Sequence, residues 1–460
     1  MTAVDLVIRG GRVVTPAADD VADIGIRDGK IVQLGGDLSG ADEIDASGRL
    51  VLPGGIDMHV HLTPVESGDD DVAWVDDFVS GSRAAACGGI TTIGNITFPR
   101  PGERPTATVH RVAEEAERDS IVDFVLHPVL LDPSAENLAD VPVLAEQGHT
   151  SIKIFMIVGE FDARVYDYLR ALELAGANGM LTLIHCEDAC IISRLTERLL
   201  AEGRADLSNY PTSRPIYSEA VAVTRAVALA EAAGAPIYIV HLSSRDALDA
   251  AERARARGLP VYVETRPIYL YFTDEIFSNP EGPLYVGNPP LRRAEDVAAL
   301  WAGLSAGTIQ TCCTDHAPWT RDQKLDPEHT IANPLPGVSD LETLMPVLFS
   351  EGVVRGRLSL RRFVEVTSTN AARLFGLFPQ KGTIAVGSDA DLAIWDPEFT
   401  KRVNGSEGQS RAGYSVYDGW DVTGWPMWTL SRGEVIVRDG NIVAGNGRGS
   451  WLTQGTSGKG

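Results

Sequence analysis

The sequence is short of cysteine, of long apolar runs and of positive charge, and each shortage excludes a class of protein. Five Cys in 460 residues, an odd number, argue against a disulfide-stabilised fold and fit the reduced thiols of the cytoplasm. No apolar run approaches the ~20 residues of a membrane span, and no apolar leader follows Met1. The net charge of -23 argues against nucleic acid or an anionic membrane as partner. We therefore expect a cytoplasmic protein without either partner.

Short strand patterns broken by Gly and Asp occur at both ends of the chain. The Asp28-Gly29 pair between two of them predicts a hairpin turn. We expect residues 1–52 and 379–446 to combine into one small β-sandwich, and residues 447–460 to form a loose tail. The patterns lie at 6–14, 22–32, 381–387, 390–395, 430–437 and 439–443.

Between the two ends, residues 53–378 alternate between strand-like and helix-like segments. Eight such alternations predict an α/β fold of the (β/α)8 (TIM) barrel type. A doubly wound open sheet is the alternative. The barrel is favoured because polar residues stand at the ends of many different strands, as catalytic barrels require. The expected strands are 51–60, 89–96, 121–130, 150–158, 181–187, 236–242, 260–265 and 308–315.

The first of these strands ends in a His-x-His pair, His59 and His61. Residues two apart on a strand point to the same face, ~7 Å from each other at the usual strand rise. Both imidazoles can therefore converge on one metal ion, and histidine is the commonest metal ligand. Taken alone, the pair also fits two polar residues on an exposed strand face.

The fourth strand contains a lysine, Lys153, among apolar residues. Burying an ammonium group is costly, and a side chain inside a barrel cannot reach solvent. Desolvation lowers the pKa of a lysine and leaves a neutral amine. Such an amine can react with carbon dioxide to form a carbamate, whose two oxygens can bridge two cations. A lysine paired with a buried carboxylate is the alternative.

Three further strands end in a histidine or an aspartate in the same phase. Nitrogen and oxygen ligands without a thiolate suit two zinc ions, with manganese, iron or cobalt as alternatives. Three cysteines near these strand ends, Cys186, Cys312 and Cys313, are predicted to fill the core. The predicted metal ligands are His59, His61, Lys153, His185, His241 and Asp315.

Longer motifs surround these residues, at 53–61, 153–156, 185–187, 241–244, 264–270, 289–292, 315–318, 367–377 and 387–392. In these motifs the sequence resembles the cyclic amidohydrolase branch of the amidohydrolase superfamily, which holds hydantoinases, dihydropyrimidinases and allantoinases. The resemblance spans almost the whole chain and implies a homotetramer with a binuclear metal site in each subunit.

The resemblance also implies a role for each ligand. Lys153, as N6-carboxylysine, would bridge the two metals; His59 and His61 would bind one of them together with Asp315, and His185 and His241 the other. Asp315 would move a proton from the attacking water to the departing ring nitrogen, and the ring would open to an N-carbamoyl acid.

The sequence departs from the hydantoinase and dihydropyrimidinase pattern at two positions. Val158 stands where those enzymes carry a Tyr that contacts the substrate and helps to stabilise the oxyanion, and Pro336 stands in place of an Asn. Backbone contacts to the ring from Asn288, Pro336 and Gly337 are still implied. Another donor, from the loop near Thr63 or from His316, is expected if the site needs one.

Three functions follow from these motifs. The first is hydrolysis of a hydantoin-like or dihydropyrimidine-like cyclic ureide. The second is an allantoinase or a cyclic imidase: both departures favour allantoinases, whereas the motifs at 395–397 and 425–428 are more similar to hydantoinases. The third is a non-catalytic scaffold of the same fold, against which the complete ligand set argues.

Overall fold

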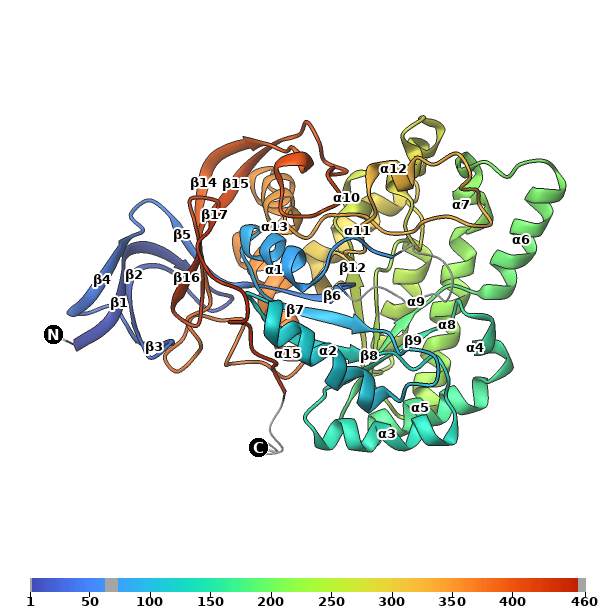
Figure 1. Cartoon of the computed structure of the whole chain (residues 1–460), viewed down its shortest axis with the longest axis horizontal. Coiled ribbons are helices and arrows are strands. Elements are labelled where there is room, and N and C mark those ends of the chain that lie inside the picture. Colours follow the sequence, from blue (N-terminus) through green and yellow to red (C-terminus); the bar gives the residue numbers. More distant parts are fainter. Residues whose placement is uncertain (1, 63–72, 454–460) are drawn as a thin grey trace.

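The computed structural model describes residues 2–62 and 73–453 of the chain. A β-domain built from both chain ends lies beside a larger barrel that is wrapped in helices (Figure 1). Strand β5 (Leu50–Pro53) of the β-domain is followed directly by β6 (Gly55–Val60), the first strand of the barrel.

The barrel closes from eight parallel strands, counted within the described residues. Pairings join β6, β7 and β8 into one sheet, and β9 to β13 into another. Isolated bridges from Val129 to Lys153 and from Val60 to His316 connect the two sheets on both sides. The predicted barrel is confirmed, and the doubly wound alternative is wrong. The remaining strands are β7 (Ile90–Thr97), β8 (Asp123–Pro128), β9 (Ser151–Phe155), β10 (Leu181–His185), β11 (Ile237–Ile239), β12 (Val261–Thr265) and β13 (Thr311–Cys312).

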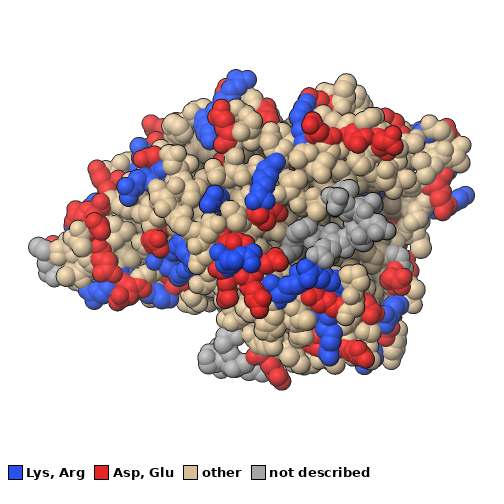
Figure 2. Space-filling view, viewed as in Figure 1, with Lys and Arg blue, Asp and Glu red and all other residues tan. Residues whose placement is uncertain are grey.

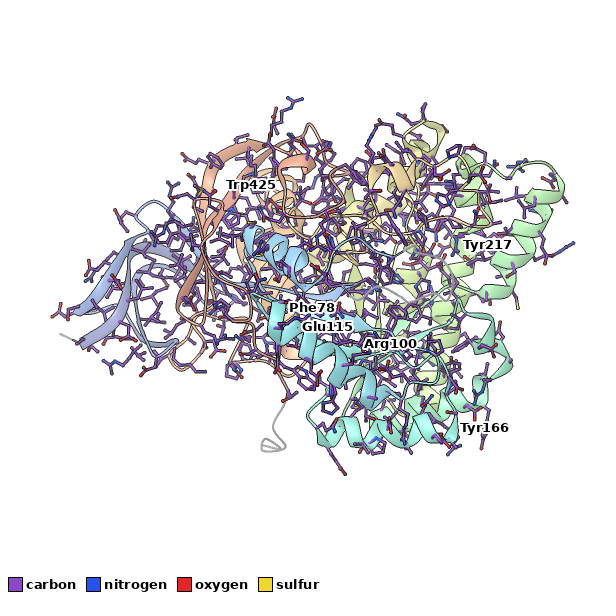
Figure 3. The ribbon with its side chains drawn as sticks, viewed as in Figure 1. Phe78, Arg100, Glu115, Tyr166, Tyr217 and Trp425 are labelled. Carbon is purple, nitrogen blue, oxygen red and sulfur yellow. The ribbon has the colours of Figure 1, made fainter. Side chains whose placement is uncertain are left out.

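Helices cover the outside of the barrel because each has one apolar face. In α2 (Pro105–Asp119), the buried residues recur with the three- and four-residue spacing of an amphipathic helix. Tyr166 on α5 and Tyr217 on α8 are 75% and 53% exposed and lie on the outer helical layer (Figure 3). The other long helices are α1 (Phe78–Cys87), α3 (Ala135–Glu146), α5 (Val165–Ala177), α6 (Ala189–Ala201), α8 (Ile216–Ala233), α9 (Arg245–Ala256) and α11 (Ala294–Ala306).

The expectation of one continuous strand at 51–60 is wrong, because Gly54 separates β5 from β6. The N–H of Gly54 donates to Asp391 O, and its carbonyl accepts from the Ser368 hydroxyl. A Cβ at this position would lie 2.1 Å from Oγ1 of Thr91, so no side chain fits. Gly54 therefore lets the chain pass from the β-domain into the barrel.

Nine strands from the two chain ends form the sheet of the β-domain, as described by the structure. The order is β17-β16-β15-β14-β5-β1-β2-β3, with β4 paired to β1. The predicted Asp28-Gly29 turn is confirmed, since both residues have the positive φ of a hairpin turn. Ile8, Val51 and Leu430 share one buried core. The strands are β1 (Thr2–Val14), β2 (Asp19–Arg27), β3 (Lys30–Leu34), β4 (Leu38–Asp45), β14 (Leu392–Arg402), β15 (Asp421–Ser431), β16 (Glu434–Arg438) and β17 (Asn441–Ile442).

Two expectations for the C-terminal part are wrong. Residues 381–387 form turns rather than a strand, because Lys381 is buried there and pairs with three carboxylates. Residues 449–452 are not a loose tail but run beside β8, where Phe124 N donates to Ser450 O at 3.0 Å and Leu452 N to Phe124 O at 2.8 Å. Residues 454–460 of the predicted tail lie outside the described residues.

Acidic and basic side chains alternate over the face shown in Figure 2, so the excess of acidic residues is not gathered into one patch there. All five cysteines lie in the described part of the chain and are free. As predicted, Cys186, Cys312 and Cys313 are buried. Within the described residues, every helix is too short or too polar to cross a bilayer.

Candidate active site

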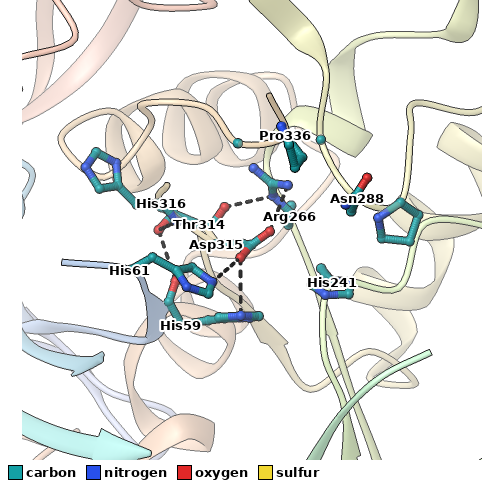
Figure 4. Close-up of polar contacts among 12 residues, drawn as sticks. His59, His61, His241, Arg266, Asn288, Thr314, Asp315, His316 and Pro336 are labelled. Carbon is teal, nitrogen blue, oxygen red and sulfur yellow. Dashed lines mark hydrogen bonds and ion pairs between the residues drawn. The ribbon is translucent and has the colours of Figure 1, made fainter. Parts of the chain in front are cut away.

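The carboxyl ends of the barrel strands bring the predicted ligands together. Asp315, after β13, lies between the two histidines of β6: its Oδ1 is 2.8 Å from His61 Nε2 and 3.2 Å from His59 Nε2 (Figure 4). The His241 ring lies 4.5 Å from that of His185 and 5.5 Å from that of His59. Lys153, on β9, is fully buried. Side chains from five strand ends therefore meet in one region.

Backbone geometry at the ends of three strands directs the side chains of the predicted ligands toward one another. Asp57 accepts hydrogen bonds from His59 N (3.0 Å) and from the Thr314 hydroxyl (2.6 Å), which ties the end of β6 to the residue before Asp315. His241 and Asp315 have φ values of 40° and 52°. Positive φ is uncommon outside glycine and is concentrated at functional sites. Here it turns both side chains out of the short strands β11 and β13.

Two buried glutamates orient the histidines; both lie in the motifs named above, but the sequence analysis assigned neither of them a role. Glu264 Oε1 lies 2.7 Å from His59 Nδ1 and accepts a hydrogen bond from His241 N at 2.9 Å. Glu187 Oε2 lies 2.9 Å from His185 Nε2. A carboxylate on the second ring nitrogen fixes the orientation of a metal-binding histidine. Their positions in the sequence could have indicated this role. Glu187 lies two residues after His185, and Glu264 lies at the end of β12, which pairs with the strand before His241.

Burial lowers the pKa of two of the predicted nitrogen ligands. It lowers the pKa of Lys153 to about 8, although the charges of Glu264 and Asp315 raise it. Burial also lowers the pKa of His61 to about 4. A neutral imidazole or amine has a free lone pair, so His61 can bind a cation near neutral pH, and the neutral form of Lys153 that reacts with carbon dioxide is more accessible than that of a solvated lysine.

The pKa of Asp315 is also lowered, but by neighbouring charges rather than by burial. Burial alone would raise it, but the nearby charges of Arg266 and His59 and the hydrogen bond from His61 outweigh that effect. The pKa of the carboxyl group therefore lies well below its usual range. Asp315 is ionised near neutral pH and can act as a ligand or accept a proton.

The donor set fits a metal centre. His59, His61 and Asp315 offer ligand atoms that all lie within 4.8 Å of one another. Lys153 Nζ, His61 Nδ1 and His241 Nδ1 are buried and have no hydrogen-bond partner among the described residues. Because buried polar atoms are ordinarily paired, these atoms require a further partner. Four imidazoles, one amine and one carboxylate, without a thiolate, are the ligands that divalent zinc or manganese accepts.

A cavity opens directly onto this cluster. Its wall contains the predicted substrate contacts Asn288, Pro336 and Gly337. It also contains apolar residues that the sequence interpretation did not include, because nothing in their local pattern separates them from core residues. These are Trp74, Phe98, Phe155, Ile157 and Ala317.

The three predicted substrate contacts differ in whether their backbone groups are already hydrogen-bonded within the protein. Pro336 O already accepts from the Trp319 indole at 2.9 Å, and Gly337 N already donates to Val286 O at 2.9 Å. The side-chain oxygen of Asn288 accepts from the Tyr210 hydroxyl. The backbone N–H and C=O of Asn288 make no hydrogen bond to the described residues. Asn288 is therefore the residue of the three with backbone groups free for a ligand.

The expectation that His316 could donate into the site is wrong. Its Nε2 lies 2.9 Å from Asp76 Oδ2, and its Nδ1 accepts from Leu341 N at 3.4 Å. The side chain is fully buried and is not among the described residues that line the cavity. Thr63, the other proposed source of a donor, lies outside the described residues.

Comparisons with known proteins find relatives over almost the whole chain. Residues 50–436 match the model of the amidohydrolase family. The chain is 39% identical to a D-hydantoinase of Ralstonia pickettii over 97% of its own length and 98% of that protein. The D-hydantoinase (dihydropyrimidinase) structure from Thermus sp. is similar, with a TM-score of 0.94, 34% identity, and 98% and 99% of the two chains covered. An L-hydantoinase (dihydropyrimidinase) from Arthrobacter aurescens gives a TM-score of 0.88, 31% identity, and 98% and 100% coverage.

Proposed function

The chain belongs to the amidohydrolase family, and we propose that it hydrolyses the ring C–N bond of a hydantoin-like or dihydropyrimidine-like cyclic ureide to an N-carbamoyl acid. The observation that carries this proposal is the convergence of His59, His61 and Asp315 on the wall of a cavity that His185 and His241 also line. The proteins named above are hydantoinases, so allantoinase is the less favoured alternative.

The family implies a binuclear divalent metal centre, and we propose that zinc occupies it. His59, His61 and Asp315 would hold one ion, and His185 and His241 the other. Lys153, carboxylated on Nζ, would be a ligand shared by both ions. When bound, the two ions lower the pKa of a shared water toward neutrality and polarise the ring carbonyl.

The residues of the chain supply the proton transfer and the binding. Asp315 accepts the proton of the attacking water and delivers it to the ring nitrogen, as the new C–O bond forms and the C–N bond breaks. The free backbone N–H and C=O of Asn288 can hydrogen-bond to the C=O and N–H of the ring. Phe98, Phe155 and Trp74 give the cavity the apolar walls typical of a small-molecule site.

We propose further that the enzyme is a homotetramer in the cytoplasm. The resemblance to the cyclic amidohydrolases supports the homotetramer. The five free thiols support the cytoplasmic location.

The substrate preference tests the proposed function. Because Val158 replaces the Tyr donor of the related enzymes and Ile157 forms the adjacent wall, we expect kcat/KM for a 5-substituted hydantoin to exceed that for dihydrouracil by about tenfold or more, equal to ~1.4 kcal/mol. One preparation is assayed on hydantoin, 5-substituted hydantoins of both hands, dihydrouracil, allantoin and succinimide.

The variant Val158→Tyr is the matched control, and it should narrow the gap by restoring a donor. Equal kcat/KM values, or dihydrouracil ahead, would refute the preference. No turnover of any cyclic ureide by metal-loaded enzyme would refute the function.

A further inference from the structure

Arg266 is a fully buried arginine behind Asp315. Its Nε donates to Thr314 O at 2.8 Å, and its Nη1 lies 3.0 Å from Asp315 Oδ2 (Figure 4). Arg266 stands two residues after Glu264, so the end of β12 carries both side chains toward the site. β12 contributes none of the proposed metal ligands, but Glu264 already orients His59 from it.

The surroundings leave the guanidinium little freedom. It lies over the Tyr269 ring, 5.5 Å from the centroid, and the Tyr269 hydroxyl donates to Pro289 O at 2.7 Å. A Cβ on Gly287 would come within 3.0 Å of Nη1, so the backbone passes close beside it. The position of the charge is therefore set from three sides.

A buried guanidinium is costly unless it is paired. Among the described residues, Asp315 is the carboxylate that reaches it within ion-pair distance. The two oxygens of Asp315 are thereby divided: Oδ1 faces His59 and His61, and Oδ2 faces Arg266. With only Oδ1 contacted by the histidines the carboxylate could turn about its Cβ–Cγ bond, and the ion pair at Oδ2 opposes that rotation.

We propose that Arg266 is a positioning residue for the reaction: it holds Oδ2 of Asp315, so that Oδ1 stays directed at the histidine pair and the carboxylate is ready to transfer a proton. The inference rests on the proposed function of Asp315. Arg266 itself does not line the cavity among the described residues, so its effect reaches the substrate only through Asp315.

The substitution Arg266→Met tests this by removing the charge while keeping much of the side-chain length. We expect kcat to fall by about 30-fold, because a misdirected base costs one to two orders of magnitude. KM should stay within about twofold because Arg266 does not line the cavity within the described residues, and the metal content should stay near that of the wild type because the five proposed ligands other than Asp315 are unchanged. A crystal structure of the variant should show the Asp315 carboxylate rotated. Arg266→Lys keeps the positive charge but not the planar, multiply donating guanidinium, so its kcat should fall only about fivefold.

Arg362→Met is the matched control for loss of stability. Arg362 also donates to backbone carbonyls, to Leu304 O at 2.5 Å and Ile309 O at 2.6 Å. These carbonyls precede β13 in the chain, so the contact lies at the opposite end of that strand from Asp315. This variant should lower the melting temperature and leave kcat unchanged. If Arg266→Met does not fold, Arg266→Lys carries the test with the same readouts.

The outcomes separate the inference from the function on which it rests. A kcat within twofold of wild type, or a loss of metal in proportion to the loss of activity, would overturn the positioning role. An unrotated Asp315 in the variant structure would overturn it as well. If the wild-type enzyme turns over no cyclic ureide, the proposed function is at fault.

Discussion

Replacing Lys153 by alanine should abolish hydrolysis, with a loss in kcat of about a thousandfold or more, equal to ~4 kcal/mol. Lys153 is fully buried, its Nζ has no partner among the described residues, and burial lowers its pKa to about 8. These properties suit a carboxylated amine that bridges two cations. Truncation to alanine would remove the two oxygens of the proposed carbamate and leave space for a replacement.

Short carboxylic acids should therefore restore part of the activity of Lys153→Ala. Acetate and propionate carry the two oxygens and the negative charge of the carbamate. Acetamide has nearly the same size without the charge, so it should restore nothing. Near-normal rate and metal content in the unsupplemented variant would show that Lys153 is not a bridge.

The substitution Asp315→Asn should lower kcat by about a thousandfold, within the range that a general base contributes. The amide keeps the shape of the carboxylate but cannot accept the proton. It also leaves the buried charge of Arg266 unpaired, which should cost about 3–5 kcal/mol of stability. Kinetics and thermal unfolding on the same preparation separate the two effects.

Asp76→Asn provides the comparison for Asp315→Asn. Asp76 is also a buried aspartate beside a histidine, at 2.9 Å from His316, but it does not line the cavity within the described residues. This variant should lose stability and keep its kcat. If Asp315→Asn kept more than a tenth of the wild-type kcat, Asp315 would not be the general base.

The metal-ligand candidates could be predicted from the sequence because barrel geometry is regular. Each strand of a (β/α)8 barrel ends at the same face, so a polar residue in phase at the end of a strand points to the same place. His59, His185 and Asp315 were recognisable for this reason, without any knowledge of distances. The fold was predictable from the same alternation of strands and helices.

The surrounding residues depend on contacts that have no local signal. Glu264 and Arg266 are two polar residues at a strand end, and only the folded chain shows that one meets His59 and the other Asp315. Trp74 and Phe98 are indistinguishable in sequence from core aromatics, yet they line the cavity. The position of residues 449–452 beside β8 likewise depends on a pairing more than 300 residues apart.

Metal titration tests the central claim most directly. Chelated protein should be inactive on a 5-substituted hydantoin, and activity should rise with added zinc until two equivalents per chain are bound. Elemental analysis of the active protein should then also find two. Full activity with less than one equivalent, or with none, would contradict a binuclear site held by His59, His61, Lys153, His185, His241 and Asp315.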